Sequence, residues 1–191
     1  MRGQPERRDQ PERGQPEWHC HHTGAAGSFD ETARRASHEE FGVAKMLAAE
    51  GHNVRTVLER KGARTPDLVA CGTAVEVKSF QSLQQRGGRP PRPEHVANKM
   101  LDARGQGAVA VIWAGSSGLT QATAKAGYSL FCERAREKGL GRIRAVRVIG
   151  EGFDMSFKPG SELSAARRRA IATVSRPPQA TSGPPGKRLE M

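Results

Sequence analysis

The sequence predicts an α/β fold with a mixed central sheet flanked by helices. Segments with helical and strand periodicity follow one another in the order α-β-β-β-α-β-α-β between residues 37 and 150. The tight turn Cys71-Gly72-Thr73 joins two strands as a hairpin, whereas helices separate the later strands. A hairpin followed by helix-linked crossovers requires both antiparallel and parallel pairs in one sheet. The 191 residues are enough for one such domain with tails.

The first helix is expected to begin after Ser37 and to end at Gly51. Ser37 followed by Glu40 is a capping-box pattern, and glycine commonly follows the last helical turn. Apolar residues recur at helical spacing between these ends, at Phe41, Ala44, Leu47 and Ala48. These positions form one apolar face of the helix.

The later elements follow from alternation, apolar runs and turn residues. A continuous apolar run is typical of a buried strand, so we expect Trp113 within GAVAVIWAG to be part of the core. Val96, Met100 and Leu101 share one face of the second helix. We expect strands at 52–60, 66–71, 74–80, 107–115 and 142–150, helices at 94–104 and 119–138, and a Gly-, Pro- and Arg-rich loop at 81–93.

The chain ends differ from this central region in composition. Residues 1–28 contain GQPE twice and DQPE once, and residues 164–191 are basic and rich in Pro and Gly. Neither segment has enough apolar side chains for a core, so we expect both to be disordered around a folded domain at 29–163. WHCHH at 18–22 has metal-binding residue types without the spacing of a structural zinc site, and we interpret it as an incidental part of the tail.

Charge and cysteine content restrict the partner and the compartment. The formal net charge is +11, and residues 31–163 alone have 21 basic and 14 acidic side chains. Such an excess favours nucleic acid as partner over a membrane; the alternative is that it serves only solubility. The cysteines, at 20, 71 and 132, form no disulfide framework, so plain structural thiols in a reducing compartment fit best. Without a signal-peptide pattern or a transmembrane segment, we expect a cytoplasmic location as encoded.

Charged residues interrupt the strand at 74–80 in a regular way. Alternation places Glu76 and Lys78 on one face, and we expect Val75, Val77 and Phe80 on the other face, packed in the core. The charged face needs surroundings that tolerate charge, such as a sheet edge lined by helix ends.

Asp67 adds a second carboxylate to this face. A hairpin that turns at Gly72 brings Asp67 opposite Glu76. Two close carboxylates repel each other, and a divalent cation, Mg²⁺ or alternatively Mn²⁺, removes the conflict by binding hard oxygen ligands. The Val77 carbonyl is a candidate further ligand, and Lys78 is placed to orient a water or offset charge on a phosphate. The alternative is a simple ion pair on an exposed sheet face.

Glu40 on the preceding helix is a candidate third carboxylate. The alternative is that Glu40 serves only as the third residue of the capping box. Glu39 is its close rival for a role in the site.

Taken together, these residues resemble the PD-(D/E)XK nuclease superfamily. The segment from Pro66-Asp67 to Glu76-Val77-Lys78 has the signature P-D-x₈-E-V-K, and the predicted elements match the αβββαβ core of that superfamily. More narrowly, EFGVAKMLAAEGHNVRTV and TPDLVACGTAVEVKS resemble the C-terminal tRNA-nuclease domain of CdiA-type contact-dependent growth-inhibition toxins.

The resemblance implies a metal-dependent nuclease, which is a phosphodiester hydrolase. Asp67 and Glu76 would bind the metal with help from the Val77 carbonyl. Lys78 would position the attacking water, and Glu40 would complete the metal shell or orient one of its waters. The first implied substrate is RNA, and tRNA in particular; the second is DNA. A toxin of this kind implies a cognate immunity protein as partner and delivery as part of a larger toxin system.

Several further residues are candidate nucleic-acid contacts by their chemistry. His95 and Lys99 are four residues apart on one helical face, which suits a backbone phosphate. The alternative for all of them is an ordinary solvated side chain, and aromatic residues are too few, at 5%, for an expected base-stacking platform. The candidates are Ser79, Gln81, His95 and Lys99, and, in the loop at 81–93, Arg86, Arg89 and Arg92.

Two other functions remain open at this stage. One is a DNA-processing endonuclease of the same superfamily, such as a resolvase or a restriction enzyme. The other is a nucleic-acid-binding module without catalysis, or a basic adaptor without any site.

Overall fold

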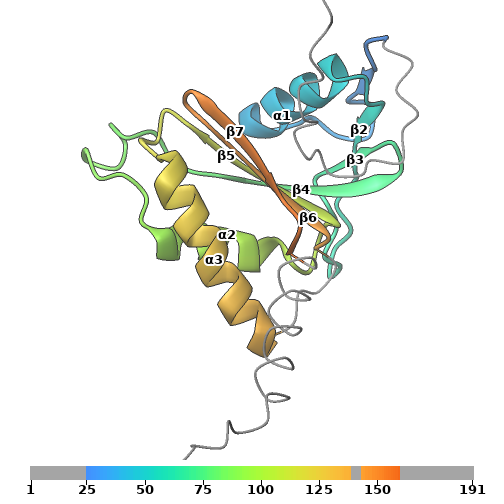
Figure 1. Cartoon of the computed structure of the whole chain (residues 1–191). Helices are drawn as coiled ribbons and strands as arrows, with labels where there is room; N and C mark the ends of the chain where they lie inside the picture. The colour runs from blue at the N-terminus through green and yellow to red at the C-terminus, as the bar shows by residue number, and fades with distance from the viewer. Residues whose placement is uncertain (1–24, 139–142, 160–191) are drawn as a thin grey trace, which may run out of the picture.

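The computed structural model describes residues 25–138 and 143–159, which form a seven-stranded sheet with helices on both faces (Figure 1). The strands lie side by side in chain order from β1 to β7. The strands are β1 (Phe29–Asp30), β2 (Val54–Thr56), β3 (Leu68–Ala70), β4 (Thr73–Ser79), β5 (Val109–Gly115), β6 (Ala145–Gly150) and β7 (Phe153–Phe157). The helices are α1 (His38–Ala49), α2 (Pro93–Ala103) and α3 (Gln121–Lys138).

The expected mixed sheet is confirmed by the strand pairing. β2, β3 and β4 form an antiparallel meander, β4, β5 and β6 are parallel, and β7 returns antiparallel to β6. A tight turn joins β3 to β4 and a longer loop joins β2 to β3, whereas α2 and α3 make the crossovers of the parallel part. The β3–β4 turn uses Cys71 and Gly72, both with positive φ (46° and 79°), as a two-residue hairpin turn requires.

Helix α1 covers one face of the sheet, and its N-terminal capping box is confirmed. Ser37 accepts a hydrogen bond from the Glu40 N–H, and the Glu40 side chain accepts one from the Ser37 N–H. The buried face of α1 consists of Val43, Ala44, Leu47 and Ala48. The expectation that Phe41 belongs to this face is wrong, because Phe41 lies at its margin, is 42% exposed and packs edge-on against Phe29.

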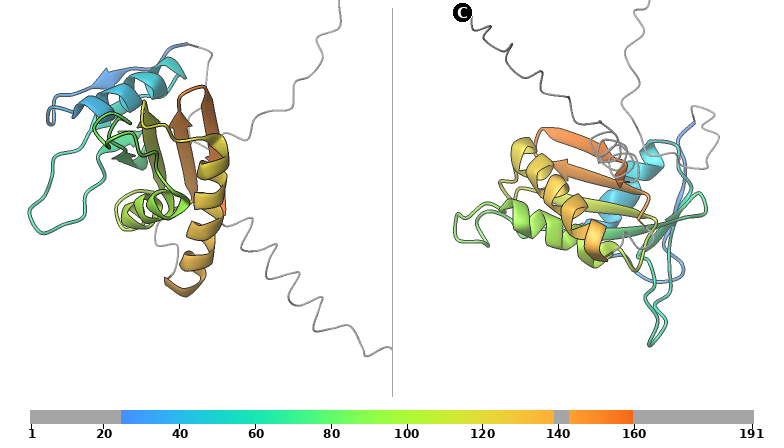
Figure 2. Two further views of the ribbon diagram at one scale, coloured as in Figure 1. Left: turned by 90° about the vertical axis from the view of Figure 1, so that its left-hand side faces the viewer. Right: turned by 60° about the horizontal axis from the view of Figure 1, so that its bottom comes forward.

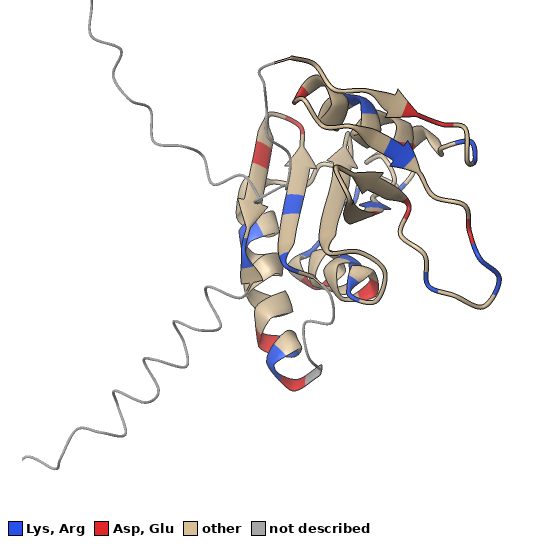
Figure 3. Ribbon diagram, turned by 90° about the vertical axis from the view of Figure 1, so that its right-hand side faces the viewer, with Lys and Arg blue, Asp and Glu red and all other residues tan. Residues whose placement is uncertain are grey.

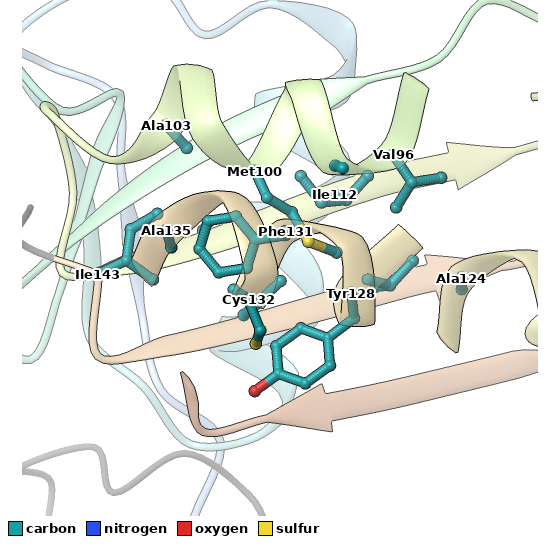
Figure 4. Close-up of a cluster of buried hydrophobic side chains, with 14 of the residues drawn as sticks. Val96, Met100, Ala103, Ile112, Ala124, Tyr128, Phe131, Cys132, Ala135 and Ile143 are labelled. Atoms are coloured by element: carbon teal, nitrogen blue, oxygen red, sulfur yellow. The ribbon is translucent and has the colours of Figure 1, made fainter. Parts of the chain in front are cut away.

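Helices α2 and α3 pack together on the opposite face of the sheet (Figure 2). Met100 of α2 and Phe131 of α3 are completely buried between them and meet Ile112 of β5 (Figure 4). Phe80 also packs against this cluster, so its expected place on the valine face is wrong. As an even-numbered neighbour of Glu76 and Lys78, it shares their side of the strand.

Several element boundaries differ from the sequence expectation. The expected strand at 52–60 is confined to Val54–Thr56, because the chain from 58 to 64 leaves the sheet as an exposed loop, with Leu58 63% exposed. This loop extends away from the sheet and bears Lys and Arg along its length (Figures 2 and 3). Strands β1 and β7 were not expected at all; a turn with Gly152 at φ 75° returns the chain from β6 into β7.

The cysteines differ partly from the expectation of plain thiols. Cys132 is a buried thiol outside any disulfide, in the α2/α3 cluster, as expected, but Cys71 is disulfide-bonded. No helix among the described residues is both long and apolar enough to cross a membrane. The tail expected at 164–191 lies outside the described residues, as do the WHCHH segment and Cys20. Of the tail expected at 1–28, the structure describes only residues 25–28.

Candidate functional site

The β3–β4 hairpin places Asp67 beside the strand that carries Glu76. Leu68 pairs with Val75, and one further step of the same register puts Asp67 opposite Glu76, as expected. The Asp67 side chain continues the pairing beyond the end of β3, because its Oδ2 accepts a hydrogen bond of 2.8 Å from the Val77 N–H. The hairpin therefore holds the two acidic residues next to each other.

Glu76 is completely buried, at 0% exposure. Its Oε1 is paired with Lys78 Nζ at 2.5 Å, whereas its Oε2 is buried without a hydrogen-bond partner among the described residues. The expected sheet edge lined by helix ends is therefore not found around this carboxylate, since β4 is the middle strand of the sheet. Gly107, before β5, packs so closely on Glu76 that an added Cβ would lie 3.1 Å from the Glu76 Cβ. A buried carboxylate oxygen without a donor is costly, so this atom calls for a proton or a cation.

Arg34, which sequence reasoning did not single out, connects the start of α1 to the acidic residues. Its guanidinium holds Glu40 with two hydrogen bonds, Nη1 to Oε2 at 2.7 Å and Nη2 to Oε1 at 3.0 Å. Nη2 also lies 3.7 Å from Asp67 Oδ1, and Nε donates to the Val57 carbonyl at 2.9 Å. The pair Arg34-Arg35 before the helix looks like any other basic pair in this chain, so only the folded structure reveals its role.

Glu40 lies where both of the roles that the sequence left open would place it. It completes the capping box at Ser37, and it also lies among the charges of the candidate site, beside Asp67 and Arg34. Its rival Glu39 points elsewhere, into a cleft next to the acidic residues. Because Arg34 and Ser37 engage the carboxylate oxygens of Glu40, this residue suits positioning better than direct ligation.

The pKa values of the carboxylates are shifted in different directions. Burial raises the pKa of Glu76 to about 7, with Asp67 adding repulsion and Lys78 opposing the shift. Burial also raises the pKa of Asp67, and neighbouring Glu40 adds to the effect, against the Val77 N–H and Lys78. Burial acts on Glu40 in the same sense, but Arg34 and the Ser37 N–H outweigh it and hold the pKa of Glu40 below its usual range. Opposed shifts in neighbouring carboxylates are a common feature of functional sites.

The donor atoms at Asp67 and Glu76 fit a hard divalent cation. Besides the carboxylates, the β3–β4 register continued two residues beyond Leu68 would bring Pro66 opposite Val77, and Pro66 has no N–H to donate to the Val77 carbonyl. Within residues 25–138 and 143–159, no group of three or more His, Cys, Asp or Glu side chains gathers closely enough to hold a metal ion. A cation bound by two carboxylates and a carbonyl would keep water in its other positions, as Mg²⁺ commonly does.

A cleft of about 770 Å³ begins one residue beyond Lys78, at the ends of β4 and β5. Four of the seven candidate nucleic-acid contacts line it from outside the arginine set: Ser79, Gln81, His95 and Lys99. Arg86 of the loop after β4 also lines the cleft, whereas Arg89 and Arg92 are exposed outside it. Asp67, Glu76 and Lys78 are not part of its walls, so the cleft and the carboxylates are neighbouring but separate features.

Trp113 was expected in the core, and this expectation is only partly correct. One side of the indole packs on the valine cluster under α1, but the residue is half-buried and lines the cleft. The sequence run around Trp113 is apolar throughout and contains no signal for this difference.

Comparisons with known proteins assign no family to the chain. No protein-family model and no curated protein matches it. Among solved structures, a chain titled "CdiA-CT/CdiI toxin and immunity complex from Burkholderia pseudomallei" aligns with a TM-score of 0.43 and 16% sequence identity, over 70% of this chain and 100% of that chain. A likeness this distant establishes neither family nor activity, so the function has to be argued from the site itself.

Proposed function

We propose that the protein is a metal-dependent endonuclease of the PD-(D/E)XK type that hydrolyses phosphodiester bonds in RNA, with tRNA as its first substrate. The observation that carries this proposal is Glu76, completely buried with one oxygen on Lys78 and the other without a partner. A simple ion pair explains neither the unpartnered oxygen nor Asp67 opposite it, whereas a cation between the two carboxylates explains both.

Each residue of the site has a distinct role in this proposal. Asp67 and Glu76, with the Val77 carbonyl, hold the divalent cation. Once bound, the cation supplies activation of water at neutral pH and neutralises charge on the phosphate. Lys78 holds the attacking water and offsets the charge that develops on the phosphate in the transition state.

Arg34 and Glu40 are positioning residues in this scheme. Arg34 holds Glu40 through two hydrogen bonds and lies near the second oxygen of Asp67, so it balances the negative charge around the site. Glu40, fixed by Arg34 and Ser37, orients Asp67 and a water of the site. Removal of either residue would disturb the placement of Asp67 without removing a donor to the metal.

The basic surface supports a nucleic-acid substrate and, in a toxin setting, an inhibitory partner. The excess of basic over acidic side chains between residues 31 and 163 favours a polyanion. A nuclease that is active inside the cell that makes it would injure that cell, so we include a small acidic immunity protein in the proposal. Such a protein would suppress cleavage when added in equimolar amount.

The proposal is tested with the purified full chain, Lys78→Ala and, as a matched control, the exposed lysine variant Lys125→Ala. Each protein is incubated with total tRNA and with plasmid DNA, in Mg²⁺ and in EDTA. We expect tRNA cleavage by the wild type and by Lys125→Ala, and its loss in EDTA and in Lys78→Ala. Cleavage of plasmid alone would assign the same site to DNA processing. No cleavage of either substrate, or cleavage indifferent to EDTA and to Lys78→Ala, would contradict the proposal.

A further inference from the structure

We infer that the cleft beside the carboxylates binds one unpaired nucleotide of a nucleic-acid strand, with its base stacked on Trp113. The cleft volume of about 770 Å³ lies within the range of small-molecule sites, roughly 300–1,000 Å³. A base with its sugar and phosphate therefore fits. The link to cleavage rests on the proposed function, whereas the binding itself does not.

The cleft lies where an α/β sheet commonly binds ligands. Ser79 at the end of β4 pairs with Trp113 of β5, so the floor of the cleft is the carboxyl end of two parallel strands. Helix α1 covers one face of the sheet and α2 the other, and both contribute walls, with His38 and Glu39 from the start of α1. Crevices outside the carboxyl ends of parallel strands are the usual sites in open sheets.

Trp113 is held from behind by the sheet and by α1. Its ring packs on the valine cluster, and a Cβ added at Gly42 of α1 would lie 3.6 Å from the six-membered ring, in ordinary van der Waals contact. Helix α1 therefore supports the indole, and Trp113 also lines the cleft. A fixed aromatic ring in a cleft wall is suited to stack on a base, and a base inside a duplex has no free face to offer.

The opposite wall is the polar face of α2, and it suits a phosphate. His95 Nδ1 accepts a hydrogen bond of 3.1 Å from the Arg92 N–H, so in the neutral ring the proton is on Nε2, which is a donor. Arg86 Nη2 lies 3.5 Å from the same Nδ1, and Lys99 Nζ lies 5.9 Å from the centre of the Phe80 ring. The residues of α2 that line the cleft, at spacings of three and four, are His95, Asn98, Lys99 and Asp102.

The nucleotide in this cleft would be a close neighbour of the bond to be cut. Ser79 is three residues beyond Glu76 on β4, a distance of about 10 Å along an extended strand. The next phosphate of the bound nucleic-acid strand would therefore approach the carboxylates of Asp67 and Glu76. This placement deepens the proposed function, because it makes the enzyme select a single-stranded segment of RNA, such as a loop, over a helical segment.

The experiment measures binding by the fluorescence of Trp113 in the full chain with Trp18→Phe, which removes the other tryptophan. EDTA is present throughout, so binding is measured without metal-dependent cleavage. The ligands are a single-stranded RNA hexamer, a DNA hexamer of the same sequence, a blunt RNA duplex and adenosine monophosphate. Binding of the single-stranded hexamer, carrying a fluorescent label, is then measured by fluorescence anisotropy for Trp113→Leu, Trp113→Tyr, Lys99→Gln and the matched control Lys125→Gln.

We expect saturable quenching by the single-stranded hexamers and at least tenfold weaker binding of the duplex. Trp113→Leu and Lys99→Gln should each weaken hexamer binding on the order of tenfold, with partial rescue by Trp113→Tyr and no change in Lys125→Gln. Absence of quenching by every ligand, or equal affinity for the duplex, would overturn the inference, whereas saturable quenching by adenosine monophosphate would support a site for a single nucleotide. Because Trp113→Leu also loses packing, the fluorescence and Lys99→Gln results decide the matter if that variant fails to fold. Tight binding of the hexamers without any RNA or DNA cleavage in Mg²⁺ would contradict the proposed function but not this inference.

Discussion

Glu76→Gln should make the folded protein more stable at pH 8 although it removes a buried ion pair with Lys78. The pKa of Glu76 is raised from 4.5 to about 7, mainly because burial disfavours the charged carboxylate. The folded state thus binds more protons than the unfolded state between these values, and stability falls as pH rises through this window. Each pKa unit corresponds to 1.36 kcal/mol, so the charged Glu76 costs the fold about 3 kcal/mol above pH 7.

The assay is urea unfolding of the wild type and Glu76→Gln in EDTA at pH 5 and pH 8. We expect the variant to exceed the wild type by about 3 kcal/mol at pH 8 and by less than about 1 kcal/mol at pH 5. Glu133→Gln, an exposed position on α3, should change stability by less than about 0.5 kcal/mol at either pH. Mg²⁺ should stabilise the wild type and have no effect on Glu76→Gln, because binding to the folded state alone raises stability.

One result would refute this reasoning directly. If Glu76→Gln is less stable than the wild type by a similar amount at both pH values, Glu76 is a structural partner of Lys78. The unpartnered Oε2 would then carry no functional meaning.

Three further predictions follow from the same contacts. Glu50→Gln should destabilise the fold by roughly 1–3 kcal/mol in urea unfolding, because it removes one of the two acidic partners of buried Arg147; no loss would mean that Asp154 alone suffices. Arg34→Gln should leave the Glu40 and Asp67 charges unbalanced and lower the free energy of unfolding in EDTA by roughly 1–3 kcal/mol. Stabilisation by Mg²⁺ should then be larger than in the wild type, and an unchanged Mg²⁺ effect would show that Arg34 has no role in the site. Mg²⁺ affinity measured by calorimetry should fall as pH drops below about 7, because protons then compete for Glu76, and a flat profile from pH 6 to 8 would exclude Glu76 as ligand.

The pairing of the acidic residues was predictable because it depends on a short stretch of chain. A two-residue turn at Cys71-Gly72 leaves one antiparallel register, and that register places Asp67 opposite Glu76. The capping box at Ser37 and Glu40 is local in the same way. Each of these two features therefore followed from residues within ten positions of one another.

The surroundings of these residues depend on distant parts of the chain and were not predictable. The burial of Glu76 depends on the close approach of Gly107, and the charge balance at Asp67 depends on Arg34, 33 residues earlier. Strand β7 was missed because FDMSF is short and has an acidic second residue, Asp154. Asp154 is tolerated there because Arg147 of β6 holds it with two hydrogen bonds.

The cleft shows a second limit of prediction from the sequence. His95 and Lys99 were expected near a phosphate from their spacing alone, and both do line the cleft. The periodicity of an apolar strand does not report whether its last residues pass the edge of the covering helix, so Trp113 was expected in the core.

The most direct test of the central claim is tRNA cleavage by the wild type, Glu76→Gln and Glu133→Gln at pH 8 in Mg²⁺, with folded fractions measured on the same samples. We predict full cleavage by the wild type and by Glu133→Gln, and no cleavage by Glu76→Gln although it is fully folded. Cleavage by Glu76→Gln at the wild-type rate would contradict the assignment of Glu76 as a metal-binding carboxylate that cleavage requires.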